Sequence, residues 1–249
     1  MLKVLFQFLL AQFFFGFYLK GIYLTWVKYL RKNLQANART LSIASGRGIN
    51  ELSLITDNYN ITCSDIEIPK FYQESKRLFG NFNYLNFNIL TDTLNDEFDN
   101  VIVMSAFYIF SYSELEKIFY KINRILKKGG TLIFDIGGPE DNSISHFFHD
   151  IYLTFEAYTV YYLSKLFNKK IGLELDSNFG FRWKNSEIIE LANKFGFKNV
   201  HIDEYDYLTE LQRSVLVNKT IKRFPSSRKK FELIGKKIPY IRMFKFKKI

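Results

Sequence analysis

The chain has 249 residues, of which 47% are hydrophobic and 24% are charged. This length suits one sizeable α/β domain with appendages, and the balance of apolar and charged residues excludes both wholesale disorder and a polytopic membrane protein. A single cysteine, Cys63, excludes an intrachain disulfide and a cysteine-based structural zinc site, which fits a reducing cytoplasm.

The net charge of +10 is distributed unevenly along the chain. Residues 1–39 contain six basic and no acidic residues, and residues 219–249 contain twelve basic residues and one acidic residue. The segment between them, residues 40–218, has a net charge of −7. The central region therefore offers no evident cradle for a nucleic-acid backbone, and the positive charge lies on the two ends.

Residues 2–30 are apolar and rich in aromatic residues, but Gln7, Gln12 and Lys20 interrupt them. A transmembrane helix is disfavoured because a charge near its middle costs about 3 kcal/mol, and no signal-peptide cleavage pattern follows. We predict that residues 1–39 form a helical extension. This extension either covers the domain or lies in a membrane interface, with its basic residues towards lipid head groups.

From Thr40 onward, short apolar runs alternate with amphipathic stretches, which is typical of successive βα units on a parallel sheet. One domain is therefore expected over residues 40–220. Strands are predicted over residues 41–44, 61–65, 84–88, 101–105, 131–136, 198–206 and 214–220, and helices over residues 49–55, 113–126 and 186–195.

Two segments depart from this alternation. We predict that residues 137–182 form an aromatic, largely helical insertion, and such an insertion generally covers a site. Residues 221–249 follow the last predicted strand as a basic tail, in which lysines alternate with aromatic and aliphatic residues. Such a tail can simply be solvated, or it can bind an anionic membrane surface or RNA. Residues 1–32 favour the membrane over RNA because they supply a second apolar and basic attachment element.

The segment LSIASGRGINE, residues 41–51, places Gly46 and Gly48 between a predicted strand and a predicted helix. Glycine lets a ligand approach the backbone, and the start of a helix offers unpaired N–H groups to it. The dinucleotide pattern G-x-G-x-x-G fails, because it would need glycine at the position of Glu51. On its own, this segment also allows an ordinary tight turn between a strand and a helix.

Two further residues indicate a nucleoside ligand. Asp65 lies at the end of the second predicted strand, 17 residues after Gly48, where its carboxylate can accept hydrogen bonds from both ribose hydroxyls. Asn88 ends the third predicted strand and can contact an adenine edge, although it can also be a simple turn residue. Ile66, Ile89 and Leu90 can enclose the adenine ring.

In this order, the segments resemble the class I S-adenosylmethionine-dependent methyltransferase family over about residues 40–220. The resemblance rests on SIASGRG, CSDIE, FNIL, EFDNVIVMSAFYIF, LEKIFYKINRILKKGGTLIFDI and EIIELANKFGFKNVHIDEYDYL. No single segment is decisive, but six of them in the right order are specific for the fold and the cofactor.

The resemblance implies a Rossmann-like α/β fold with a seven-stranded, mostly parallel sheet, helices on both faces and an antiparallel last strand. It also implies S-adenosylmethionine as cofactor. The single cysteine indicates a cytoplasmic protein, and the apolar and basic ends indicate that it can attach peripherally to the inner face of the membrane. The residues that would bind the cofactor are Ser42, Ala44, Ser45, Gly46, Gly48, Asp65, Ile66, Asn88, Ile89 and Ser105.

Two residues depart from the family pattern. The family commonly has an acidic residue at the position of Ser42 and glycine at that of Ala44. Ser42 lacks the charge that helps to hold the donor's ammonium group, and Ala44 adds a methyl group where the backbone turns. The departures leave open a second hypothesis, a non-catalytic protein that keeps the fold to bind a nucleoside or a partner.

Methyl transfer requires alignment of the acceptor and exclusion of water more than covalent chemistry. The expected reaction is O-methylation of a small-molecule, lipid-linked or saccharide acceptor, with an RNA methyltransferase as a further alternative. A hydroxyl acceptor would benefit from a general base, for which Tyr108, His146 and His149 are the candidates. Two histidines and Asp150 are too few ligands to indicate a metal site, and none is predicted.

Overall fold

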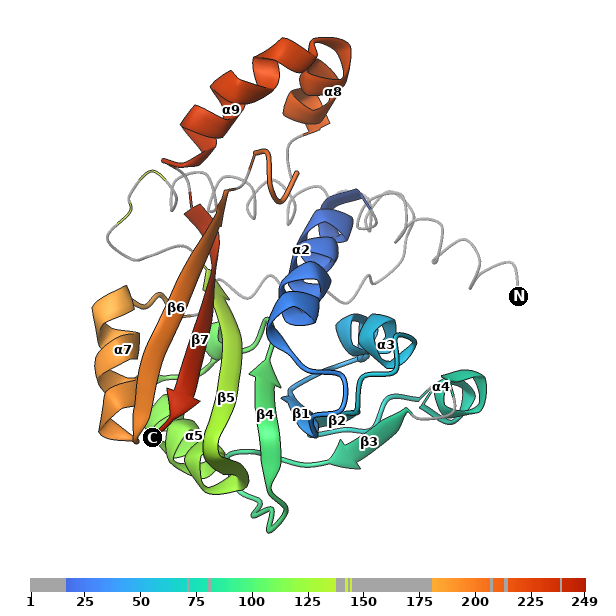
Figure 1. Cartoon of the computed structure of the whole chain (residues 1–249), viewed down its shortest axis with the longest axis vertical. Coiled ribbons are helices and arrows are strands. Elements are labelled where there is room, and N and C mark those ends of the chain that lie inside the picture. The colour runs from blue at the N-terminus through green and yellow to red at the C-terminus, as the bar shows by residue number, and fades with distance from the viewer. Residues whose placement is uncertain are drawn as a thin grey trace, which may run out of the picture.

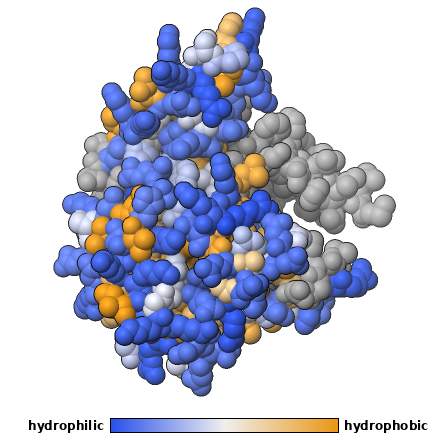
Figure 2. Space-filling view, viewed as in Figure 1, coloured by the Kyte–Doolittle hydropathy of each residue, from blue (hydrophilic) through white to orange (hydrophobic). Residues whose placement is uncertain are grey.

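The computed structural model shows a twisted sheet with helices against both faces (Figure 1) and a largely hydrophilic visible surface (Figure 2). The candidates His146 and His149, most of the insertion over 137–182 and the first 16 residues lie outside the part of the chain that it describes. The described residues are 17–70, 72–79, 82–137, 142, 144, 181–206, 208–212, 215–237 and 239–249.

Seven strands form the sheet, in the order β3-β2-β1-β4-β5-β7-β6. The first five in this order pair in parallel, whereas β7 is antiparallel to both of its neighbours. The expected fold class, including the antiparallel last strand, is therefore confirmed. The strands are β1 Thr40–Ile43, β2 Ile61–Asp65, β3 Asn83–Asn86, β4 Phe98–Val103, β5 Leu126–Gly137, β6 Phe197–Asp206 and β7 Pro239–Lys248.

Helices lie against both faces of this sheet (Figure 1). The α-helices are α2 Phe17–Asn33, α3 Ile49–Ile55, α4 Tyr72–Phe79, α5 Tyr112–Ile125, α7 Asn185–Lys194, α8 Val215–Arg223 and α9 Arg228–Gly235. Of these, α8 and α9 extend beyond one end of the sheet (Figure 1). Two short 3-10 helices, η2 Phe107–Ile109 and η3 Pro225–Ser227, complete the described elements.

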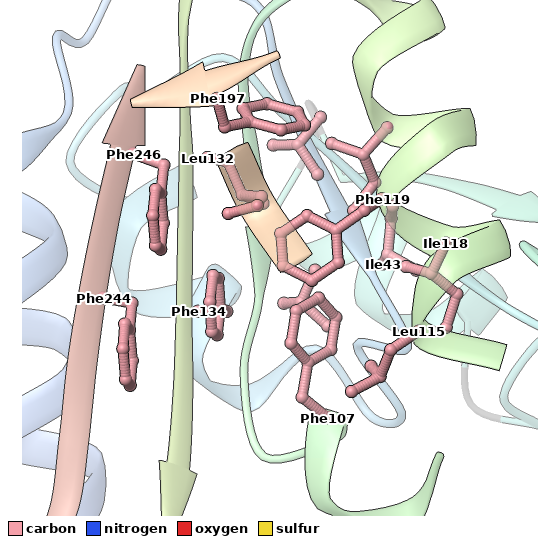
Figure 3. Packing of buried hydrophobic residues seen from close by; sticks show 14 of the residues in the cluster. Ile43, Phe107, Leu115, Ile118, Phe119, Leu132, Phe134, Phe197, Phe244 and Phe246 are labelled. Carbon is pink, nitrogen blue, oxygen red and sulfur yellow. The ribbon is translucent and has the colours of Figure 1, made fainter. Parts of the chain in front are cut away.

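One face of the sheet packs against α5 and α7. α5 begins at a capping box formed by Ser111 and Glu114, and its apolar stripe faces the core. On the sheet, the ring of Phe134 in β5 lies parallel to those of Phe244 and Phe246 in β7, at centroid distances of 5.0 and 5.7 Å (Figure 3). These ring contacts help to hold the C-terminal strand beside β5.

The opposite face is covered by α2 and α3. Trp26, Tyr29 and Leu30 of α2 are buried there, in the same cluster as Leu54 of α3 and Met243 of β7. The described part of the N-terminal extension thus packs on the domain, which is one of the two arrangements expected for residues 1–39. Within the described ranges, none of the helices combines the length and the apolar character needed to cross a bilayer.

The C-terminal region differs from the sequence expectation in two ways. Residues 214–220 are expected to form the last strand, but Val215–Arg223 is helix α8. Its residues Lys219, Lys222 and Arg223 have the i, i+3, i+4 spacing of one helix face. The last strand is instead β7, within the expected tail 221–249.

The sequence of β7, PYIRMFKFKK, explains this second difference. Its side chains alternate between the two sheet faces, so that Phe244 and Phe246 enter one core and Met243 enters the other. An alternation that suggests an amphipathic tail is therefore a buried strand. Of the expected membrane-binding tail, the residues before β7 keep all their basic side chains at the surface, whereas β7 buries Arg242 and partly buries Lys245 and Lys248.

Candidate functional site

The candidate site lies at the carboxyl ends of the parallel strands. β1 pairs with β2 on one side and with β4 on the other, so the strand order reverses at β1. Open α/β sheets generally bind ligands at such a switch point. The loops after β1, β2 and β4, which contain most of the predicted cofactor-binding residues, meet at this edge.

The loop after β1 has a left-handed backbone at three positions. The φ angles of Ala44, Gly46 and Gly48 are 53°, 54° and 65°. The N–H of Ser45 donates to the carbonyl oxygen of Ser64 in β2 at 2.9 Å, and the N–H of Gly48 donates to the carbonyl oxygen of Ser45 at 2.8 Å. The loop is therefore compact and attached to β2, despite the strain of a left-handed alanine.

The two glycines differ in their surroundings. A Cβ atom at Gly48 would lie 3.1 Å from the Phe82 ring and 3.4 Å from the Sγ of Cys63, so a side chain here would require the Phe82 ring to shift. Among the described residues, no atom beyond the chain neighbours lies within 4 Å of a Cβ at Gly46. The loop is thus packed against Phe82 and Cys63 at Gly48, whereas a ligand can approach its backbone at Gly46.

Asp65 is joined directly to this loop. One carboxylate oxygen accepts from the N–H of Gly46 at 2.8 Å, and the other accepts from the N–H of Ile66 at 2.7 Å. The hydroxyl of Tyr84 donates to the carbonyl oxygen of Gly46 at 2.7 Å and fixes the loop from β3. A carboxylate oxygen has two lone pairs, so Asp65 can still accept hydrogen bonds from a pair of hydroxyls.

Beneath the loop lies a carboxylate that the sequence analysis missed. Glu51, in the first turn of α3, is 1% exposed and accepts a hydrogen bond of 2.6 Å from the Oγ of Ser42. Its Oε2 atom is buried without a hydrogen-bond partner among the described residues. Burial raises the pKa of Glu51, although the Ser42 hydrogen bond opposes this shift. An acidic side chain absent from β1 is thus supplied beside this strand by α3.

A second missed carboxylate belongs to the turn after β4. Ser105 has a φ of 57°, and its N–H donates to the Oδ1 of Asp135, at the end of β5. Asp135 is 3% exposed, and burial raises its pKa to about 7. The signal in the sequence is a carboxylate within the apolar run TLIFDI. Asp135 therefore holds the strained turn in which Ser105 was predicted to face the donor.

The remaining predicted residues occupy varied positions. The Asn88 side chain accepts from the N–H of Leu90 at 3.0 Å, as in an Asx turn, after β3 has ended at Asn86. Ile66 is exposed beside Asp65, whereas Ile89 is buried in the core on the α5 side. Tyr108 is half-buried in η2. Within the described ranges, no three histidine, cysteine or acidic side chains gather as metal ligands would.

Comparison with known proteins agrees with this geometry. Residues 41–134 match the model of a methyltransferase domain family. No curated protein matches the chain in sequence. Its structure is similar to that of a 1,6-didemethyltoxoflavin-N1-methyltransferase from Burkholderia thailandensis, with a TM-score of 0.59 and 12% identity over 98% of this chain and 88% of that one.

Two further solved structures share the fold. Magnesium protoporphyrin IX methyltransferase from Synechocystis PCC 6803 has a TM-score of 0.57 and 12% identity, over 94% of this chain and 86% of its own. The N-methyltransferase NodS from Bradyrhizobium japonicum WM9 has a TM-score of 0.53 and 10% identity, over 93% and 96%. These structures and the strand order show that the chain has the fold of class I methyltransferases, and the domain match covers its residues 41–134.

Proposed function

We propose that the protein transfers a methyl group from S-adenosylmethionine to a hydroxyl of a small-molecule or lipid-linked acceptor. The observation that carries this proposal is the joined pair of loops after β1 and β2. There the carboxylate of Asp65 accepts from the N–H of Gly46 and retains lone pairs for ribose hydroxyls. The Burkholderia and Synechocystis structures contain bound S-adenosylhomocysteine, and both enzymes are named for small-molecule substrates.

The acidic side chains of the site suit this donor. S-adenosylmethionine carries a sulfonium and an ammonium group against one carboxylate, so its net charge is positive. Asp65, Glu51 and Asp135 come from three elements that meet at the same edge of the sheet. We assign Asp65 to the ribose and Glu51 to the ammonium group, because the Oε2 of Glu51 is a buried acceptor without a described partner.

The chemistry is a direct displacement. The bound donor supplies an electrophilic methyl carbon; the acceptor oxygen forms a bond to it, the carbon–sulfur bond breaks, and the hydroxyl proton passes to a base or to water. The turn at Ser105 is the segment expected to border the methyl group. Asp135 is a positioning residue for this turn, since its carboxylate accepts from the Ser105 N–H. Tyr108, His146 and His149 stay candidates for the base.

The second candidate, a non-catalytic nucleoside-binding protein, is favoured by one observation. Ala44 occupies a left-handed position where the family commonly has glycine, and such strain can lower donor affinity. An RNA substrate is the weaker alternative, because residues 40–218 have a net charge of −7.

Methyl transfer itself separates these functions. The purified protein would be incubated with methyl-tritiated S-adenosylmethionine and fractions of a cell extract, namely polar metabolites, lipids and RNA. Label in a small-molecule or lipid fraction, lost with Asp65→Ala and kept with the exposed control Asp96→Ala, is the expected result. Donor binding without transfer to any fraction would support the non-catalytic protein, and label in RNA alone would contradict the proposed acceptor class.

A further inference from the structure

The connection from β6 to β7 carries a basic helical unit, residues 215–237, made of α8, η3 and α9. It contains eight basic residues and a single acidic one, Glu232, which pairs with Arg228 at 2.9 Å. This unit therefore concentrates positive charge on a protein whose central region is acidic. All eight basic residues are exposed: Lys219, Lys222, Arg223, Arg228, Lys229, Lys230, Lys236 and Lys237.

Apolar side chains lie exposed among these cations. Phe224, Leu233 and Ile234 are 55%, 61% and 49% exposed. The guanidinium of Arg223 lies 5.5 Å from the centroid of the Phe224 ring. Helices that lie in a membrane interface combine the same two features, because apolar side chains enter the acyl boundary while lysine and arginine reach the phosphates.

The base of the basic helical unit is fixed to the sheet. The buried carboxylate of Asp206, at the end of β6, accepts from the N–H groups of Leu208 and Thr209 at 2.8 and 2.6 Å. A Cβ at Gly235, the last residue of α9, would lie 2.4 Å from Asp206, so α9 ends directly against this residue. The unit is thus held where it leaves the sheet.

Its place relative to the candidate site follows from the strand register. Asp206 is paired with Pro239 at the start of β7, and Gly137 at the end of β5 is paired with Ile241. The basic helical unit therefore leaves from the edge at which the parallel strands end. In Figure 1, α8 and α9 stand away from the sheet beyond this edge.

We infer that the basic helical unit docks the protein on an anionic membrane surface. The positive charge complements anionic head groups, and Leu233 and Ile234 provide aliphatic contacts that a nucleic acid would not use. Recognition of single-stranded RNA relies on stacking aromatic residues, and Phe224 is the one strongly exposed aromatic side chain in the described part of the unit. Docking here would turn the carboxyl edge of the sheet towards the lipid.

This orientation indicates an amphiphilic acceptor, whose polar group reaches the site from the membrane. The inference of an amphiphilic acceptor rests on the proposed methyl transfer, whereas the inference of membrane docking does not. The two are therefore tested separately.

Docking is tested by flotation of the full chain with vesicles of phosphatidylcholine alone and of phosphatidylcholine with phosphatidylglycerol. Each basic residue near an anionic surface strengthens binding by roughly fivefold, so Lys229→Glu/Lys230→Glu should weaken binding to the anionic vesicles by at least about 25-fold. Leu233→Ser should weaken it by roughly tenfold. The matched control Lys128→Glu/Lys198→Glu changes the same charge at exposed positions near the amino ends of β5 and β6.

Selective binding to anionic vesicles that is lost in the first variant and kept in the control is the expected result. Equal binding by both variants overturns the inference, and so does binding to a single-stranded RNA oligonucleotide without binding to vesicles. Titration with S-adenosylhomocysteine on the same preparations reports the donor site independently. Label from tritiated donor in the lipid fraction supports the amphiphilic acceptor, and label confined to polar metabolites contradicts it.

Discussion

Replacement of Glu51 by glutamine would separate the charge of this side chain from its shape. The amide keeps an oxygen that can accept the hydrogen bond from Ser42, but it removes the negative charge that we assign to the donor's ammonium group. A hydrogen bond to a charged group contributes about 1.5–3 kcal/mol. Glu51→Gln should therefore weaken the binding of S-adenosylhomocysteine by roughly 10- to 150-fold.

The same substitution should stabilise the protein without the donor. Glu51 is 1% exposed, its Oε2 has no described partner, and burial raises its pKa. Because the folded state favours the protonated acid, the contribution of Glu51 to stability is complete only at pH values below the ordinary pKa of glutamate. This contribution is lost as the pH rises through the raised pKa of the folded state. The melting temperature of Glu51→Gln should thus exceed that of the wild type at neutral pH. If the variant instead lost affinity because it misfolded, its melting temperature would fall below that of the wild type.

The assay is calorimetric titration with two ligands. S-adenosylhomocysteine contains the ammonium group, and methylthioadenosine keeps the adenosine and sulfur but lacks the amino-acid part. Only the first should bind Glu51→Gln more weakly, and the exposed control Glu67→Gln should bind both as the wild type does. Equal weakening for both ligands, or no weakening for either, would refute the assignment of Glu51.

Three further substitutions test the site's structure. The pKa of Asp135 is raised to about 7 from 3.8, so its contribution to stability is complete below about pH 4 and is lost as the pH rises through 7. Asp135→Asn keeps an acceptor for the Ser105 N–H. Its free energy of unfolding, measured in urea, should therefore rise relative to that of the wild type by up to about 4 kcal/mol between these pH values. A difference that does not change with pH would contradict this. Gly48→Ala should lower the free energy of unfolding by about 2 kcal/mol, because its φ is 65° and the added methyl group would displace the Phe82 ring. An unchanged urea midpoint would contradict this packing. Ala44→Gly should raise the melting temperature, with a gain of about 0.5 kcal/mol by relief of a left-handed alanine, whereas destabilisation would show that this φ is not strained.

The sequence predicts the first half of the sheet well, because each element there has a local signal. Residues 61–65 form β2 as expected, and the glycine loop is followed by helix α3 at Ile49–Ile55. Strand periodicity, glycine at the turn and a carboxylate after the next strand are all visible within 25 residues. The contact between Gly46 and Asp65 agrees with their expected proximity.

Features that depend on tertiary pairing could not be predicted in this way. From the sequence alone, β7 resembles a basic tail, because the residue on which its phenylalanines stack, Phe134, lies more than a hundred residues earlier in the chain. Glu51 looks like an ordinary helix residue, since only the fold turns it beneath the loop towards Ser42. In both cases, tertiary packing rather than a local sequence pattern decides that a charged side chain or a basic segment is buried.

The central claim is that the loop after β1 and Asp65 together bind S-adenosylmethionine. Its most direct test is calorimetric titration of the wild type and Asp65→Ala with S-adenosylmethionine and S-adenosylhomocysteine. We predict micromolar binding of both ligands by the wild type and a loss of roughly 10- to 150-fold in the variant. Absence of binding to the wild type, or equal binding by the variant, would contradict the account.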